Sequence, residues 1–170
     1  SFDVGAGNPG ATALRFFSNN TGAIRDCRFI AGEGSGSVGL DLSHHDMNGP
    51  LLVKHCEVVG FRRGITASRA VNSQVFEDIA LRGQSEIGFS NEGQPISIRG
   101  LTSHNAVPAL GTYGTLLLVD SALTGTGNAR ANDAGNTVRL SSDAGGTAGL
   151  LHFTGSPVTF TGIPTLPAVT

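Results

Sequence analysis

The densest group of chemically active side chains lies between positions 41 and 46. It contains Asp41, two adjacent histidines, His44 and His45, and Asp46. Carboxylates and imidazoles take up and release protons, and the same groups ligate metals. We therefore interpret Asp41, His44, His45 and Asp46 as candidate catalytic residues, and we assign no metal ligand set.

Structural roles remain open for the same side chains. Adjacent residues on an extended loop point apart, so His44 and His45 also fit a solvated loop. Asp41 is expected beside Arg15 and also fits a plain ion pair. Whether these residues are catalytic or structural depends on how the fold positions them.

The amino-acid composition excludes some classes of protein to which this chain could belong. The chain has 170 residues, 25 glycines, no tryptophan, one tyrosine and a net charge of −2. The absence of a basic stripe argues against nucleic acid as a partner. No apolar run is long enough to span a membrane. Scarce helix formers and abundant Gly, Ser, Thr and Asn favour many short strands joined by tight turns.

Six-residue segments of one pattern recur along the chain, with apolar residues favoured at the first, fourth and sixth positions. Their starts are 29, 23, 22 and 21 residues apart. Such a repeat is typical of a solenoid, in which each coil stacks on the previous one. We predict an all-β, right-handed parallel β-helix of about six to seven coils, because parallel crossovers are nearly always right-handed. The copies are Ile24–Phe29, Val53–Val58, Phe76–Leu81, Ile98–Ser103 and Val119–Thr124.

The third position of each copy is expected to bend the chain between two sheets. Gly, Asp and His tolerate the left-handed backbone region better than most residues, and no β-branched residue stands here. His55 is therefore interpreted as a turn residue. Ser121 is the least expected member. The column contains Asp26, His55, Asp78, Gly100 and Ser121.

A second apolar series lies between these copies and predicts the other strand of each coil. Its outward neighbours should form a column of their own, with Arg15 next to Asp41. The apolar series is Leu14, Leu40, Ile65, Phe89 and Leu110. The outward column is Arg15, Asp41, Thr66 and Ser90, and glycines precede three members of the series, at Gly39, Gly64 and Gly88.

The two cysteines, Cys27 and Cys56, fall in one inward column. They are too few for a disulfide scaffold and have no second pair for a zinc site. We predict two buried free thiols stacked on each other. A disulfide is geometrically marginal, because in-register neighbours lie near the upper limit of Cβ separation.

The ends of the chain carry further expectations. No capping segment is recognised before Leu14, so an upstream segment, another chain or self-association is expected to cover that end. We assign residues 1–153 to the β-helix domain and residues 154–170 to a proline-containing tail, because proline is poorly placed in central strands. The start at Ser1 fits a removed signal or an excised piece, and predicts a secreted or cell-surface protein.

Several segments resemble coils of the pectate-lyase-like superfamily, which includes pectate lyases, polygalacturonase-like and β-1,3-glucanase-like hydrolases, and phage tailspikes. The resemblance covers roughly Asn8 to Thr124. Family motifs with paired aspartates, Gly-Asp-Gly or Gly-His-Gly are absent, so no catalytic residue is carried over. The matching segments are Ala13–Phe16, Gly22–Phe29, Gly39–Leu42, Gly49–Cys56 and Gly60–Ile65.

The resemblance implies an extracellular protein that binds polysaccharide along the outer face of one sheet. On that expectation, Arg15, Arg62 and Arg63 bind substrate, with the last two neutralising a uronate carboxylate. No cofactor is expected, and Ca²⁺ is suggested by the resemblance alone.

Two functions stay open. The first is a polysaccharide hydrolase or lyase, or the non-catalytic part of one. The second is a structural or adhesive solenoid that self-associates or binds a surface, mildly favoured by the scarcity of aromatic sugar platforms. An enzyme should gather acid and base groups on one outward column over two or three coils, whereas a structural rod should not.

Overall fold

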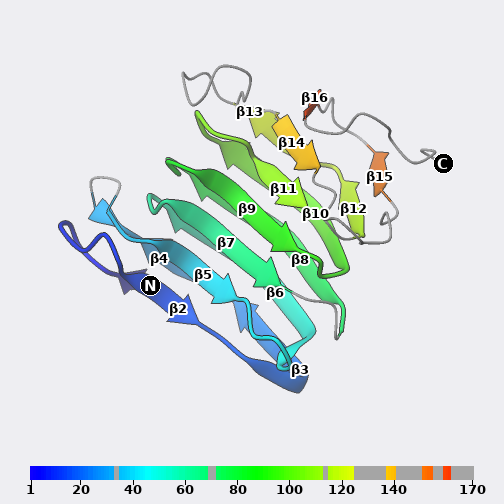
Figure 1. The fold of residues 1–170 in the computed structure, drawn as a ribbon, viewed down its shortest axis with the longest axis horizontal. Helices are drawn as coiled ribbons and strands as arrows, with labels where there is room; N and C mark the ends of the chain where they lie inside the picture. Colours follow the sequence, from blue (N-terminus) through cyan, green and yellow to red (C-terminus); the bar gives the residue numbers. More distant parts are fainter. Residues whose placement is uncertain are drawn as a thin grey trace.

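The computed structural model is an all-β parallel solenoid of about five turns (Figure 1). It describes residues 1–32, 35–68, 72–112 and 115–124, and the strand backbone of 137–140, 151–154 and 159–161. The paired strands in this part of the chain all run parallel. The solenoid prediction is therefore confirmed, with fewer turns than the six to seven expected.

Two sheets form the walls of the solenoid. The nine-stranded sheet contains β1 (Phe2–Asp3), β3 (Ser18–Arg25), β4 (Arg28–Ile30), β6 (Asn48–Val59), β8 (Gln74–Arg82), β10 (Ile96–His104), β12 (Leu116–Val119), β13 (Ala122–Thr124) and β15 (Leu151–Thr154). The seven-stranded sheet contains β2 (Thr12–Arg15), β5 (Val38–Leu42), β7 (Arg63–Ser68), β9 (Ile87–Glu92), β11 (Leu110–Thr112), β14 (Thr137–Leu140) and β16 (Thr159–Thr161).

Apolar residues stack on their counterparts in successive turns and fill the space between the sheets. In the seven-stranded sheet, Leu14 pairs with Leu40, Leu40 with Ile65, and Ile65 with Phe89, as the second series predicts. From Leu40 to Phe89 these side chains are buried. Burial of such columns supplies the main driving force for stacking one turn on the next.

The bend column adopts the left-handed conformation predicted for it. Asp26, His55, Asp78 and Gly100 have φ values of 54°, 50°, 52° and 71°. The bend does not separate two sheets, however. Strands β6, β8 and β10 run through it in one sheet, and their register is the same on both sides of the bend. A single left-handed residue turns the chain without ending the ladder.

The last copy of the repeat lies one residue away from its predicted alignment. Val119 pairs with Arg99 and Ala122 with Thr102, so Asp120, with φ 49°, takes the bend position. Ser121 instead falls in the buried inward column and is 1% exposed. Its hydroxyl donates to the Val119 carbonyl and accepts from the Leu101 amide, which satisfies a polar group at this buried position.

Glycine permits the close approach of turns in the second series. A Cβ atom at Gly64 would collide with the carbonyl oxygen of Gly88, and one at Gly88 would collide with that of Ala109. The glycines noted in the sequence therefore mark positions where backbone packs directly on backbone.

Toward the C-terminus, β16 lies within the predicted tail and pairs with β14 in the seven-stranded sheet. Residues 162–170 lie outside the described part of the chain.

Within the described residues, no helix has the length and apolar character needed to cross a membrane.

Candidate functional site

Asp41 lies on β5 in a closed hydrogen-bond network. Arg15 Nε donates to its Oδ2 at 2.7 Å, and Thr66 Oγ1 donates to its Oδ1 at 3.1 Å. The amide of Ser43 donates to the same Oδ1 at 3.0 Å, and the Ser43 hydroxyl donates there as well. The side chain is 6% exposed. Burial alone would raise the pKa of Asp41, but the bonds from Ser43, Arg15 and Thr66 together lower it.

The rest of this stretch forms an exposed loop. The amides of Asp46 and Met47 donate to His44 Nδ1 at 3.1 and 2.9 Å, so His44 closes its own turn. His45 Nε2 lies 2.7 Å from Asp46 Oδ2. The His44 ring contacts Phe17 and His45, with centroid distances of 4.4 and 4.6 Å. The His44 ring is stacked on His45 and tilted against Phe17, so the three rings adjoin one another.

Arg62 and Arg63 share one carboxylate. Arg62 Nη2 lies 2.8 Å from Glu86 Oε2, and Arg63 Nη2 lies 2.7 Å from Glu86 Oε1. Burial would raise the pKa of Glu86, but bonds and charge from the two arginines lower it. Both guanidinium groups are thus partly neutralised within the protein.

The structure does not bring all predicted site residues together. Arg63 pairs with Val38 at one end of β5, whereas Asp41 pairs with Thr66 three residues further along. That interval corresponds to about 10 Å along a strand. Arg15 is the only predicted substrate-binding residue bonded to Asp41 in the described part of the chain.

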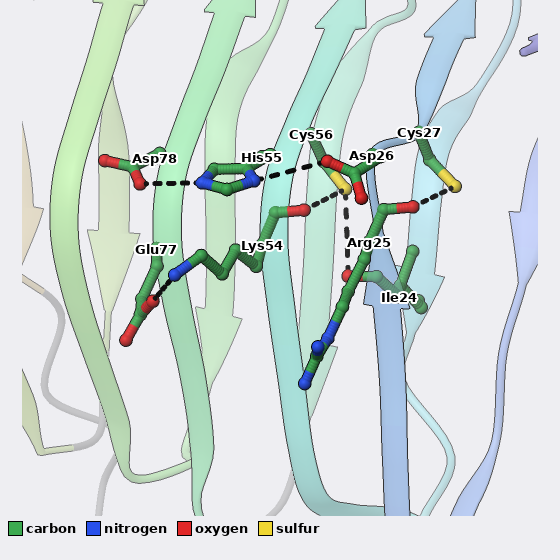
Figure 2. Close-up of polar contacts among 9 residues, drawn as sticks. All are labelled: Ile24, Arg25, Asp26, Cys27, Lys54, His55, Cys56, Glu77 and Asp78. Atoms are coloured by element: carbon green, nitrogen blue, oxygen red, sulfur yellow. Dashed lines mark hydrogen bonds and ion pairs between the residues drawn. The ribbon is translucent and has the colours of Figure 1, made fainter.

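A more concentrated set of titratable groups lies on the outward face of the nine-stranded sheet, in the bend column (Figure 2). His55 Nδ1 is 3.2 Å from Asp26 Oδ1, and His55 Nε2 is 3.3 Å from Asp78 Oδ2. The three side chains are 52%, 76% and 60% exposed, for His55, Asp26 and Asp78. They belong to three successive turns and form an open row that solvent or a ligand can reach.

Charged residues flank this row in the neighbouring column. Lys54 Nζ donates to Glu77 Oε2 at 2.7 Å, and this bond is the main reason that the pKa of Glu77 is lowered. Arg25 pairs in register with Lys54, and Arg99 pairs with Glu77. Arg25 and Lys54 directly precede Asp26 and His55 in the chain, as Figure 2 shows, and Arg99 lies two turns beyond Lys54 in the same column.

The cysteines lie directly after the first two members of the row. Both are free, and each thiol donates to the carbonyl two residues earlier at 3.2 Å, Cys27 to Arg25 and Cys56 to Lys54. Cys56 is buried, and burial raises the pKa of its thiol. Cys27 is only partly buried, contrary to the prediction, because it is the first member of its column in the described residues.

The Asp26–His55–Asp78 row can move protons at an accessible face. The sequence pattern placed all three residues in the bend column, where they were predicted to be turn residues. The missed signal was that three consecutive members of one outward column are ionisable. Within the described residues, no group of three or more His, Cys, Asp or Glu side chains is placed to hold a metal ion. The Ca²⁺ suggested by the family resemblance therefore has no fitting ligand set there.

Comparison with known proteins places the chain in no established group. No protein-family model, no curated protein and no experimentally determined structure matches it.

Proposed function

We propose that this β-solenoid is a polysaccharide hydrolase or lyase that acts on the outward face of the nine-stranded sheet, with His55 at the centre of its site. The observation that carries the proposal is the row of Asp26, His55 and Asp78, which gathers acid and base groups from three successive turns. Side chains of this type in a solvent-accessible row suit general acid–base catalysis.

The surroundings of the row support this substrate class. Cations at Arg25, Lys54 and Arg99 lie beside it and suit contact with acidic groups of a sugar chain. The resemblance of the coils to the pectate-lyase-like superfamily supports polysaccharide as the ligand. A protein with that substrate is proposed to be secreted or held at the cell surface, where such polymers lie.

An activity screen with one variant tests the proposal. The purified chain is incubated with pectic, uronate-containing and β-glucan polysaccharides, and both reducing ends and unsaturated products are followed. His55→Asn removes the imidazole but keeps a residue that tolerates the left-handed bend. We expect cleavage by the parent and a loss of about 100-fold or more in the variant, with an unchanged melting temperature.

Two comparisons make this screen decisive. Asp41→Asn tests the buried network around Asp41. If Asp41→Asn loses cleavage while His55→Asn keeps full activity, the active site lies on the Arg15–Asp41 face instead. His45→Asn removes an exposed imidazole outside the row and should leave cleavage unchanged. A parent chain that cleaves none of the polysaccharides would overturn the enzymatic proposal.

The second candidate is a non-catalytic solenoid that binds a surface or self-associates. The adjoining rings of Phe17, His44 and His45 favour it, because Phe17 is 46% exposed and held against the half-buried His44. Among the strands that the structure describes, β3 is also paired with β6 alone. Polysaccharide binding that is lost in Phe17→Ala without any cleavage by the parent, or concentration-dependent assembly in sedimentation, would favour this function.

A further inference from the structure

We infer that this chain associates with a second copy of itself through one end of the solenoid, as a two-fold symmetric dimer. The contact surface is formed by the apolar side chains of the first turn, strands β1 to β4, that stay partly or largely exposed. We call this surface the end face, and it consists of Phe2, Val4, Ala13, Leu14, Phe16 and Cys27. The inference is independent of whether the protein cleaves polysaccharide.

The inward columns of the core reach the surface at the end face. Phe2 pairs in register with Phe29, and Phe29 with Val58. Phe29 and Val58 are fully buried, whereas Phe2 is 40% exposed, with its ring stacked on that of Phe29 at a centroid distance of 5.3 Å. Leu14 is likewise only partly buried, although Leu40, its partner in the next turn, is fully buried. A further apolar layer on the end face would complete the burial of these columns.

Open strand edges lie at the same end of the solenoid. Among the described strands, β2 pairs with β5 alone and β3 with β6 alone (Figure 1). An unpaired edge presents backbone amides and carbonyls to which another extended strand can bond. The register of β3 with β6 is regular from Gly22 to Arg25 but shifts between Asn19 and Gly22. Strand pairing at β3 is therefore limited to a short stretch, and apolar packing contributes most of the contact.

These features together favour a second copy as the partner. A partner that covers this end must present two strand edges, one for each sheet, with apolar side chains between them at the same spacing. The end face of another copy meets all of these requirements. Two identical surfaces meet around a two-fold axis, so the contact is self-complementary and the assembly closes at two chains.

The charged residues at this end favour one direction for the contact. Arg15 is the last residue of β2 and Arg25 the last residue of β3, and both are exposed. A two-fold axis that crosses the strands makes each strand antiparallel to its own copy. The two Arg25 side chains then lie at opposite ends of the paired strands, as do the two Arg15 side chains. Parallel strands would instead place like charges opposite each other, which is destabilising.

Sedimentation equilibrium of the purified chain tests the association. We expect a monomer–dimer equilibrium without larger species. Phe2→Asp places a charge on the end face and should weaken the dimer at least about tenfold. Val75→Asp is the matched control, because Val75 is 37% exposed on β8, away from the end face, and it should leave the dimer unchanged.

Three outcomes of this experiment would overturn the inference. The first is a parent chain that stays monomeric at every concentration up to about 1 mM. The second is an assembly that keeps growing with concentration, because a two-fold contact closes at two chains. The third is equal weakening of the dimer by Phe2→Asp and Val75→Asp.

The reactivity of Cys27 locates the interface without any substitution. Cys27 is partly buried on the end face, whereas Cys56 is buried in the next turn. Both thiols are alkylated at protein concentrations below and above the dimer dissociation constant, and the modified cysteines are identified by mass spectrometry. We expect Cys27 to react several-fold more slowly in the dimer and Cys56 to react slowly in both states, because alkylation requires access to the thiol. A dimer in which Cys27 reacts as fast as in the monomer would place the interface elsewhere and overturn the inference.

Discussion

Two clusters of charged residues on this solenoid differ in what surrounds their carboxylates. Asp41, on the seven-stranded sheet, is enclosed by Arg15, Ser43 and Thr66, and its side chain is 6% exposed. Asp26 and Asp78, on the nine-stranded sheet, flank His55 and stay largely in solvent. The first cluster uses its carboxylate as an acceptor for fixed donors. The second leaves titratable groups on an open face, where they can meet a ligand.

The comparison shows how stacking decides the role of a charged residue in a solenoid. Each outward side chain contacts its counterparts one turn before and one turn after it. Asp41 is stacked between Arg15 and Thr66, which donate to it. His55 is stacked between two carboxylates, and the three side chains stay largely in solvent. Residue type alone does not distinguish these situations.

The largest loss of stability is expected from a charge placed in the inward column, on the core side of the Asp26–His55–Asp78 row. Ile79 is 1% exposed and pairs with Cys56 in the inward column beneath His55. Ile79→Asp would bury an unpaired charge and should abolish folding. Circular dichroism and thermal melting check this, with Val75→Asp on the exposed side of β8 as the control. A cooperative melt close to that of the parent would contradict the inward register.

Backbone packing in the seven-stranded sheet should give the next largest effect. Gly64→Ala would press a Cβ against the Gly88 carbonyl, which is backbone and cannot move aside easily. We expect a loss of about 3 kcal/mol in the free energy of unfolding. Gly10→Ala, which has open space around it, should change little. Urea denaturation of the two variants compares them, and equal midpoints would refute the close approach of the turns.

The closed cluster is tested by removing its charge. Asp41→Asn weakens the bonds from Arg15 and Ser43 and should cost about 2 kcal/mol at neutral pH. The pKa of Asp41 is lowered in the folded protein. Its stabilising contribution is therefore present above the ordinary aspartate pKa and is lost as the pH falls through the lower folded value. Denaturation at several pH values should show the gap between parent and variant closing in acid, and a constant gap would count against this account.

The open row should respond least in stability. Asp78→Asn alters an exposed contact with His55 and keeps a bend-compatible residue, so we expect a change in the free energy of unfolding below about 0.5 kcal/mol. The same substitution should still lower any cleavage, because Asp78 contacts the His55 ring. A stability loss as large as that of Asp41→Asn would show that the row is structural, and the contrast between the two clusters would disappear.

The repeat could be recognised in the sequence wherever residue chemistry restricts the backbone. Aspartate, histidine and glycine marked the bend at Asp26, His55, Asp78 and Gly100, and all four have positive φ. At the last turn, the sequence pattern aligned Ser121 with the bend, although Asp120 occupies it. A one-residue shift reverses which side chain points inward, and apolar spacing alone did not resolve it.

The candidate site was less predictable than the fold. Adjacency along the chain drew attention to His44, His45 and Asp46, but two backbone amides engage His44, and the other two residues pair with each other. The Asp26–His55–Asp78 row joins residues 29 and 23 positions apart, and only the register between turns brings them together.

By itself, the sequence determined the parallel solenoid, the apolar columns and the left-handed bend, because each depends on residue types repeated at a regular interval. The tertiary structure decided which charged groups were enclosed and which stayed open. That difference depends on contacts between successive turns: Ser43 and Thr66 close around Asp41, whereas His55 faces a carboxylate on each side. Long-range register sets these contacts, and a periodic pattern specifies it only to within a residue.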